Sequence, residues 1–208
     1  MKIKIICILI FYTFTFSWAK NKNITRSFIS FKRNTICSMN FSPDSKNISC
    51  YVSYLNLLTF NLKNKNEKKV KINIARSTNI KYSPNGKYIG LNFGTITEFA
   101  DPIGRIIIVS TKTKKVIIDK KTGVRYTDGF DFSPNDKFFI YSGYLHKKQI
   151  IILSLPNGRI VSKFKGYNGP VKFSPCGKFF AYTTDKFTIH IRAVKTGRLV
   201  RVLRGHSK

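Results

Sequence analysis

Phe173-Ser174-Pro175-Cys176-Gly177-Lys178 is one of four copies of a short phrase in which an aromatic residue precedes Ser-Pro, two small or polar residues and Lys. Proline presets φ for the first corner of a tight turn, and Asn, Asp and Gly tolerate the second corner. Because apolar runs flank every copy, the phrase predicts a hairpin turn between two strands. The other copies are Phe41-Ser42-Pro43-Asp44-Ser45-Lys46, Tyr82-Ser83-Pro84-Asn85-Gly86-Lys87 and Phe132-Ser133-Pro134-Asn135-Asp136-Lys137.

The spacing of the phrase sets the expected architecture. Its prolines lie 41, 50 and 41 residues apart, at or slightly above the length of a four-stranded propeller blade. We therefore expect an all-β, β-propeller-like fold of about four four-stranded blades that form an incomplete or open ring. The repeats are expected at 35–75, 79–124, 128–165 and 169–204. A fragment of a longer protein and a small closed ring stay open as alternatives.

Strands can be predicted around each turn from the alternation of apolar residues. In the first repeat they are expected at Thr35–Phe41, Asn47–Ser53, Leu57–Leu62 and Val70–Ile74. In the fourth they are expected at Val171–Phe173, Phe179–Thr183, Phe187–Arg192 and Leu199–Leu203.

The amino terminus allows two interpretations. Lys2 and Lys4 precede an apolar run, which ends at Ser17-Trp18-Ala19 before a polar stretch. This layout predicts a signal peptide over 1–19 with cleavage after Ala19, and hence a secreted or extracytoplasmic protein. Residues 14–19 also alternate like a strand, in which case they stay in the chain and the protein is intracellular. Residues 20–34 form an N-terminal segment that could supply an outer blade strand.

The fourth repeat resembles a WD40 repeat along its length. The matching features are the Phe-Ser-Pro-x-Gly-Lys turn, Asp185 in a tight turn, the Lys195-Thr196-Gly197-Arg198 hairpin and the pair Gly205-His206. The resemblance weakens toward the amino terminus, and the Trp-Asp dipeptide of the family is absent from all four repeats. It implies a divergent WD40-like propeller that binds other macromolecules, with Asp185 as a structural turn residue.

No catalytic, metal or cofactor site is predicted. The sequence has no Gly-rich phosphate loop, nucleophile elbow or HExxH motif. Its four cysteines, Cys7, Cys37, Cys50 and Cys176, show no metal-ligand spacing with the three histidines. Cys37 and Cys50 flank one hairpin turn, so they are either paired in a disulfide or buried as free thiols. His190 on an expected strand is interpreted as a structural or surface histidine.

Charge gives the clearest prediction about partners. The net charge is +29, which attracts polyanions such as nucleic acid, acidic proteins and anionic membranes. In an antiparallel blade the first and third turns lie at one end, so we expect a basic face there. The connection at 94–104 would lie at the other end and offers a loop for a specific partner through Glu98, Asp101 and Pro102. The expected basic face comprises Lys46, Lys63, Lys65, Lys68, Lys69, Lys87, Lys112, Lys114, Lys137, Arg159, Lys178, Lys195 and Arg198.

The predicted function is that of a non-enzymatic, exported protein-interaction scaffold. Its expected partner is another protein, with self-association to close the ring, and no small-molecule substrate is expected. The alternative is an intracellular basic propeller that associates with RNA, a ribonucleoprotein complex or another anionic surface. Abundant Lys, Asn and Ile are also the bias of an AT-rich genome, so the charge alone does not decide between these functions.

Overall fold

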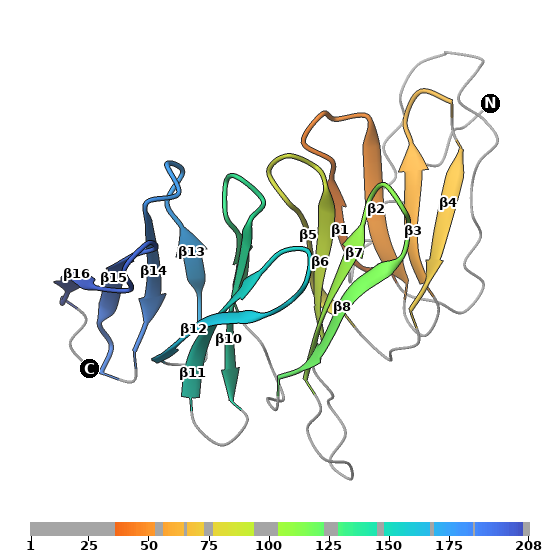
Figure 1. Cartoon of the computed structure of the whole chain (residues 1–208). Helices are drawn as coiled ribbons and strands as arrows, with labels where there is room; N and C mark the ends of the chain where they lie inside the picture. Colours follow the sequence, from red (N-terminus) through yellow and green to blue (C-terminus); the bar gives the residue numbers. More distant parts are fainter. Residues whose placement is uncertain are drawn as a thin grey trace, which may run out of the picture.

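The structure is a computed structural model that describes residues 36–52, 56–64, 66–72, 77–93, 104–122, 129–144, 148–166, 169–184 and 186–205. Within these ranges the chain forms sixteen strands in four four-stranded antiparallel sheets (Figure 1). Each sheet is a meander in which neighbours in sequence are hydrogen-bonded neighbours in space. The predicted all-β, propeller-like fold of four-stranded blades is confirmed. The described residues contain no helix that could span a membrane.

We number the blades in chain order. The first blade consists of β1 (Ile36–Phe41), β2 (Asn47–Val52), β3 (Asn56–Asn61) and β4 (Glu67–Lys71). The second consists of β5 (Ser77–Tyr82), β6 (Tyr88–Phe93), β7 (Arg105–Ser110) and β8 (Val116–Lys121). The third consists of β9 (Phe130–Phe132), β10 (Phe138–Tyr144), β11 (Lys148–Ser154) and β12 (Ile160–Lys165). The fourth consists of β13 (Val171–Phe173), β14 (Phe179–Thr183), β15 (Ile189–Ala193) and β16 (Leu199–Leu203).

Among the strands of the first and fourth blades, the largest difference from the expected limits is at β4. This strand begins at Glu67, three residues before the predicted start. The outer hairpin is shorter than expected because the Asn61 side chain accepts hydrogen bonds from the backbone N–H groups of Lys63 and Asn64, and Asn66 pairs back with Asn61. An Asn side chain that folds back on its own turn lets the chain reverse early. The strand β15 also starts at Ile189, two residues after the predicted Phe187.

The Ser-Pro phrase forms the same turn in all four blades. The second residue after the proline has a left-handed backbone in every copy: φ is +54° at Ser45, +69° at Gly86, +55° at Asp136 and +68° at Gly177. The serine hydroxyl accepts a hydrogen bond from the backbone N–H five residues later in every copy, at 2.8–3.1 Å. Serine therefore recurs because its side chain satisfies the first N–H of the following strand.

An apolar core fills each joint between neighbouring blades. We call the side of a blade that faces the next blade in the chain its forward face, and the opposite side its backward face. Burying one large apolar side chain contributes about 1.5–3 kcal/mol, so each joint stabilises the fold. The cores include Tyr51, Leu57, Ile89 and Leu91 in the first joint, Ile106, Ile108, Phe132 and Phe139 in the second, and Ile150, Ile152, Phe173 and Phe180 in the third.

Side-chain oxygens also link the innermost strands across two joints. Asn40 on β1 accepts a 3.1 Å hydrogen bond from the backbone N–H of Tyr82 on β5. Asp131 on β9 does the same for Phe173 on β13, at 2.9 Å. Between these two links, the Lys81 ammonium pairs with the Asp131 carboxylate. A chain of polar contacts therefore runs along the inner strands from the first blade to the fourth.

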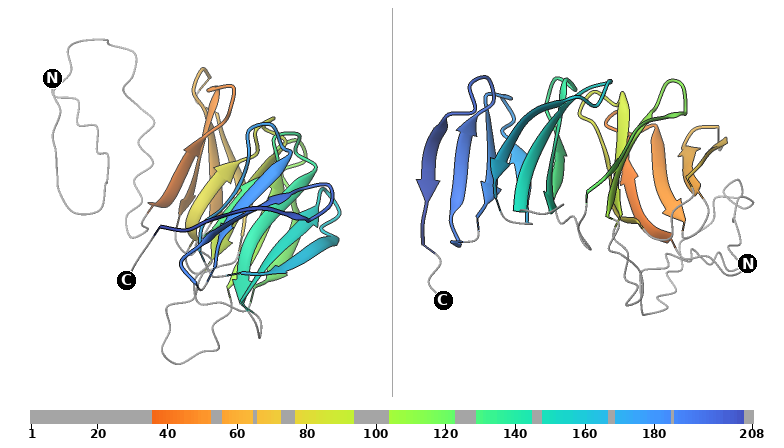
Figure 2. Two further views of the ribbon diagram at one scale, coloured as in Figure 1. Left: turned by 90° about the vertical axis from the view of Figure 1, so that its left-hand side faces the viewer. Right: turned by 60° about the horizontal axis from the view of Figure 1, so that its bottom comes forward.

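The four blades stand side by side in chain order. Figure 1 and the right-hand view of Figure 2 show the first and fourth blades at opposite ends of this row. The backbones of the third and fourth blades approach closely at Gly129, where an added Cβ would fall 2.4 Å from the carbonyl oxygen of Gly169. The arrangement leaves the backward face of the first blade and the forward face of the fourth without a neighbouring blade among the described residues.

Candidate interaction surfaces

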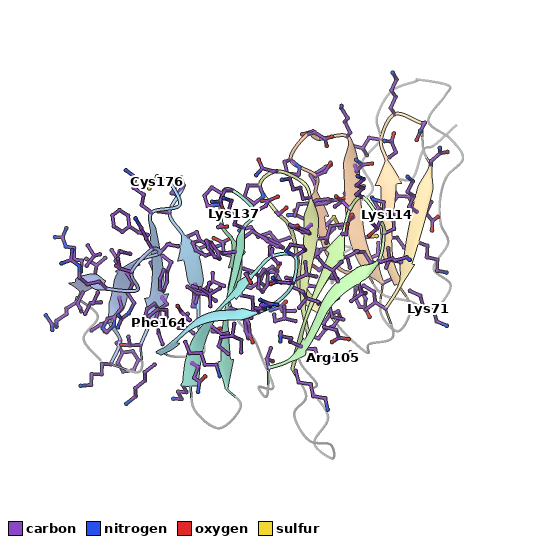
Figure 3. All side chains as sticks on the ribbon, in the orientation of Figure 1. Lys71, Arg105, Lys114, Lys137, Phe164 and Cys176 are labelled. Carbon is purple, nitrogen blue, oxygen red and sulfur yellow. The ribbon has the colours of Figure 1, made fainter. Side chains whose placement is uncertain are left out.

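The end of the blades that carries the Ser-Pro turns is basic. The four lysines of the phrase, Lys46, Lys87, Lys137 and Lys178, are all exposed there, and Figure 3 shows Lys137 and Cys176 at this end. The outer turns add exposed charges at Lys63, Lys68, Lys69, Lys112, Arg159, Lys195 and Arg198, with Lys114 half-buried. Lys65 lies outside the described residues. Asp44, Glu67 and Asp136 lie at the same end, so this surface is not free of negative charge.

Positive charge is also present at the opposite end of the blades. It comes from strand ends and connections, at Lys71, Lys121, Lys148, Lys165, Lys186 and Arg204. The acidic residues expected there, Glu98, Asp101 and Asp185, lie outside the described residues, as does Pro102. The proposed partner loop at 94–104, the turn role of Asp185 and the separation of charge between two faces therefore stay predictions.

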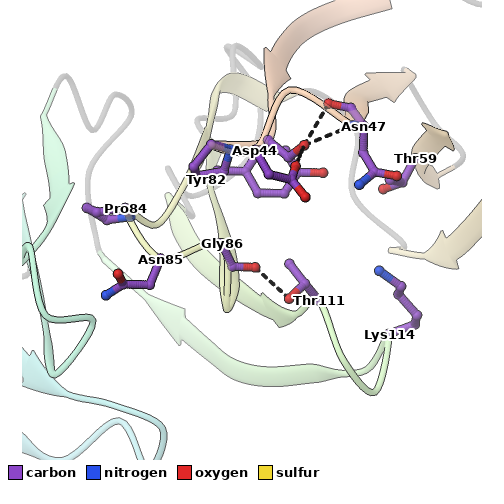
Figure 4. A pocket seen from close by; sticks show the side chains of 11 residues that line it. Asp44, Asn47, Thr59, Tyr82, Pro84, Asn85, Gly86, Thr111 and Lys114 are labelled. Atoms are coloured by element: carbon purple, nitrogen blue, oxygen red, sulfur yellow. Dashed lines mark hydrogen bonds between the residues drawn. The ribbon is translucent and has the colours of Figure 1, made fainter. Parts of the chain in front are cut away.

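A polar pocket of about 510 Å³ lies between the first and second blades at the turn end (Figure 4). Asp44 within it accepts hydrogen bonds from Ser42 Oγ at 2.6 Å and from the Lys46 N–H at 3.1 Å, and these bonds lower the pKa of its carboxyl. Thr111 Oγ1 donates to the carbonyl of Gly86 at 2.7 Å. Burial lowers the pKa of Lys114 on the far side. Because Asp44 and Thr111 already have partners in the turns, this pocket does not indicate a ligand.

A second pocket of about 510 Å³ lies between the outer parts of the third and fourth blades. Its lining is cationic and hydroxylated, and includes Lys165, Lys186, Arg192, Arg204, Thr184 and Thr188. His190 also lines it, and the pKa of this imidazole is lowered by burial and then by the positive charges of Arg192 and Arg204.

The guanidinium of Arg192 is held in place on three sides. Nε donates to Tyr182 Oη at 2.9 Å, and Nη1 donates to the carbonyl of Gly197 at 2.8 Å. The ring of Phe164 lies under it, 4.9 Å from Cζ to the ring centroid. Planar guanidinium groups stack well on aromatic rings, so this geometry orients the charge without neutralising it.

The backward face of the first blade is built like the faces that are buried elsewhere. Phe41 is 57% exposed, although the aromatic residue at the same position of the phrase is 7%, 2% and 8% exposed at Tyr82, Phe132 and Phe173. Met39, on the same strand, is 55% exposed. An apolar side chain whose three counterparts are buried marks a part of a packing face that lacks its partner. Cys50, Val52 and Leu58 on the same face are buried, so the exposed part of this face lies around Met39 and Phe41.

The forward face of the fourth blade shows the same property. Ile189 and Ile191 are half-buried, whereas the residues in register with them in the second and third blades are almost fully buried. Those counterparts are Ile106, Ile108, Ile150 and Ile152, each at most 3% exposed. Phe179 and Leu203 beside them are 37% and 39% exposed. Both ends of the row therefore present sheet faces with the composition of an interior joint.

The described cysteines differ in environment. Cys50 is a buried free thiol, and burial raises its pKa to about 11. Cys176 is an exposed free thiol whose pKa is lowered by its hydrogen bonds to Ser174 and to the Lys178 N–H. Of the two alternatives for Cys50, the buried free thiol is therefore the one observed. The described residues contain no group of three or more His, Cys, Asp or Glu side chains that could hold a metal.

Sequence reasoning missed the two end faces and the cationic pocket. The end faces depend on which copy of each repeated apolar position is covered by a neighbouring blade, and the sequence of a single repeat does not show this. The pocket had a signal in the sequence, since Thr188, His190 and Arg192 alternate along a predicted strand and so share one of its sides. That side faces the third blade, which the sequence alone did not show.

No family model and no curated protein matches the chain. Among solved structures it is similar to U3-55K, a β-propeller, with a TM-score of 0.61 and 10% identity over 84% of this chain and 53% of that one. It is also similar to the hydrazine synthase of Kuenenia stuttgartiensis, with a TM-score of 0.59 and 16% identity over 80% of this chain and 48% of that one. The chain spans about half the length of each. At these identities the likeness shows the propeller fold alone.

Proposed function

We propose that the chain is a non-enzymatic, protein-interaction propeller unit, and that its end faces bind a second copy of itself. The observation that supports this most is the exposure of Phe41, whose counterparts in the other blades are buried between blades. A second copy offers a forward face of the kind that covers this position at every joint inside the chain. Two copies would bring together twice four sheets, within the usual size range of propellers.

The pairing would be head to tail: the forward face of the fourth blade of one copy meets the backward face of the first blade of the other. Such an interface joins two different surfaces, and it ends growth only if a ring closes. Exposed sheet edges and faces otherwise invite open-ended association. Closure by two copies would bury Phe41, Met39, Phe179 and Ile191, which supplies the driving force.

A mixing experiment tests this proposal. Phe41→Glu places a charge on the backward face of the first blade, and Ile191→Glu places one on the forward face of the fourth. Each variant alone should sediment as a monomer, because every head-to-tail contact then contains one damaged face. An equimolar mixture should form dimers through the one contact that joins two intact faces. Ile160→Glu is the matched control, because Ile160 is 47% exposed on an outer strand away from both faces.

Two results would overturn the proposal. One is a wild-type chain that stays monomeric at micromolar concentration. The other is a mixture of the two glutamate variants that behaves like each variant alone. Loss of association in the Ile160→Glu control would show that added charge, and not the end faces, is responsible.

Export is part of the same proposal and is supported by the layout of residues 1–19. If the protein is exported, Edman sequencing of the mature chain should begin at Lys20. A chain that keeps residues 1–19 would favour the intracellular alternative, in which the basic surface contacts RNA. Binding to RNA should then weaken steeply as salt is added, because phosphate contacts release counterions.

A further inference from the structure

The cationic pocket between the third and fourth blades lies where the other joints are apolar. His190 and Arg192 pair with Tyr182 and Phe180 on the backward face of the fourth blade. In the third blade the same register positions are occupied by Ile151 and Leu153, and in the second by Ile107 and Val109. These four apolar residues are at most 5% exposed, and they form part of the joint cores.

Placing His and Arg where the other joints have an apolar pair costs free energy of folding, because polar groups must be withdrawn from water. The fourth blade compensates for part of this through the bonds of Arg192 to Tyr182 and Gly197. The charge itself stays unmatched within the described residues, where the ion pairs are Lys81 with Asp131 and Arg105 with Asp119. Asp185, which follows Thr184 in the chain, lies outside the described residues.

More positive charge converges on the same pocket from three other segments. Lys165 comes from the end of β12, Lys186 from the connection between β14 and β15, and Arg204 from the end of β16. Thr184 and Thr188 add hydroxyl groups that bond to each other at 2.7 Å, and the hydroxyl that accepts this bond keeps its own hydrogen for a ligand. No carboxylate of a described residue lines the pocket.

We propose that this pocket binds a phosphate group. A doubly charged, multi-acceptor anion suits several cationic donors and hydroxyls better than a singly charged carboxylate does. A guanidinium fixed beforehand by Tyr182 and Phe164 loses little freedom on binding, and Arg is the side chain suited to paired hydrogen bonds with phosphate oxygens. The group could be inorganic phosphate or a phosphoryl group on a protein side chain. This inference is independent of pairing between copies, since the pocket lies within one chain.

The test uses the full chain and isothermal titration calorimetry. The first probe is inorganic phosphate, and the second is a short peptide containing phosphoserine, with its unphosphorylated form as control. The double variant H190I/R192L gives the fourth blade the apolar pair that the other joints carry, so it should remain folded. We expect it to bind phosphate at least about tenfold more weakly than the wild type, because charge-assisted bonds are lost. Lys178→Gln is the charge-matched control at the opposite end and should bind as the wild type does.

The two probes distinguish the sources of the group. Binding of inorganic phosphate and of the phosphopeptide, both lost in H190I/R192L, supports the pocket. Tighter binding of the phosphopeptide than of phosphate identifies a phosphorylated side chain as the ligand, and the reverse identifies free phosphate. Equal affinity in the wild type and in H190I/R192L would show diffuse attraction to the basic surface and would overturn the proposal. The proposal would also be overturned if neither inorganic phosphate nor the phosphopeptide bound to the wild-type chain.

Discussion

The Asp131 carboxylate accepts a 2.9 Å hydrogen bond from the backbone N–H of Phe173, and so ties the innermost strand of the third blade to that of the fourth. Its other oxygen pairs with Lys81 from the second blade. One buried side chain therefore contacts the inner strands on both sides of its own. At the first joint the side-chain oxygen of Asn40 accepts the corresponding hydrogen bond from the Tyr82 N–H. An amide oxygen can therefore replace the carboxylate as acceptor for the backbone N–H.

Two substitutions at Asp131 should separate these contacts. Asp131→Asn keeps an oxygen for Phe173 and loses only the pair with half-exposed Lys81, so the free energy of unfolding should fall by about 1 kcal/mol or less. Asp131→Leu removes both contacts and leaves a buried N–H without a partner, so the loss should be about 2–4 kcal/mol. Urea denaturation followed by circular dichroism measures both values. Equal losses would show that the backbone link contributes nothing.

A second link between blades predicts a different pair of effects. Ser83 Oγ donates to Asp136 Oδ2 at 2.7 Å, joining the turns of the second and third blades. Asp136 has a φ of +55°, which glycine adopts without strain. The Asn85 N–H also donates to Asp136 Oδ1, at 3.3 Å. Asp136→Gly should therefore lower the free energy of unfolding by about 1–3 kcal/mol through loss of these two bonds, without a change in backbone strain. Ser45→Gly, at the same position of the first blade with a φ of +54°, should leave stability unchanged or raise it slightly.

Thiol chemistry should separate the two described cysteines. The lowered pKa and exposure of Cys176 favour its thiolate, so it should react rapidly with a maleimide at neutral pH. Cys50 should react only when the protein unfolds, because burial both shields it and raises its pKa to about 11. Peptide mapping by mass spectrometry after a short pulse of reagent measures this difference. Labelling of Cys50 at the rate of Cys176 would show that the first blade opens in the native state.

The environment of His190 predicts a pH dependence. Its pKa is lowered in the folded protein, so the unfolded chain takes up a proton first and protonation favours unfolding. Its contribution to stability should be present above the ordinary histidine pKa and should be lost as the pH falls from that value through the lower pKa of the folded state. Part of the acid destabilisation should therefore disappear in His190→Ile. Thermal melts of the two proteins between about pH 7.5 and pH 5 make the comparison.

Phosphate should act on the same group in the opposite direction. A bound anion offsets the charges of Arg192 and Arg204, so it should raise the pKa of His190. An NMR titration of the imidazole with and without phosphate measures the shift, with His190→Ile to assign the signal. An unchanged pKa at saturating phosphate would place the anion away from this histidine.

The repeat architecture could be predicted because it rests on local chemistry. Proline, serine and a residue tolerant of positive φ define the turn within six residues, and this turn set the strands on either side. Phe179–Thr183 and Leu199–Leu203, for example, are observed at their predicted limits. The early start of β4 was missed because it depends on one Asn side chain that bonds its own turn.

The surfaces were harder to predict because they depend on which blade has a neighbour. Phe41 and Phe173 both begin a Phe-Ser-Pro turn, yet one is exposed and the other is buried. His190 looked structural because nothing local shows that its side of the strand faces Phe164 and Lys165. The hydrogen bond between Asp131 and Phe173 joins residues 42 positions apart. At this separation the pattern of the sequence does not show which residues meet.

Sedimentation velocity of the wild-type chain tests the central claim most directly, that the two end faces are blade joints completed by a second copy. With a net charge of +29 the copies repel each other, so added salt should screen the charge and strengthen association through the apolar faces. At micromolar concentration in about 0.15 M salt, we expect the full chain, whose mass is 23.9 kDa, to form a species of twice that mass, which becomes more populated as salt is raised. A 23.9 kDa monomer at every salt and protein concentration would contradict the account.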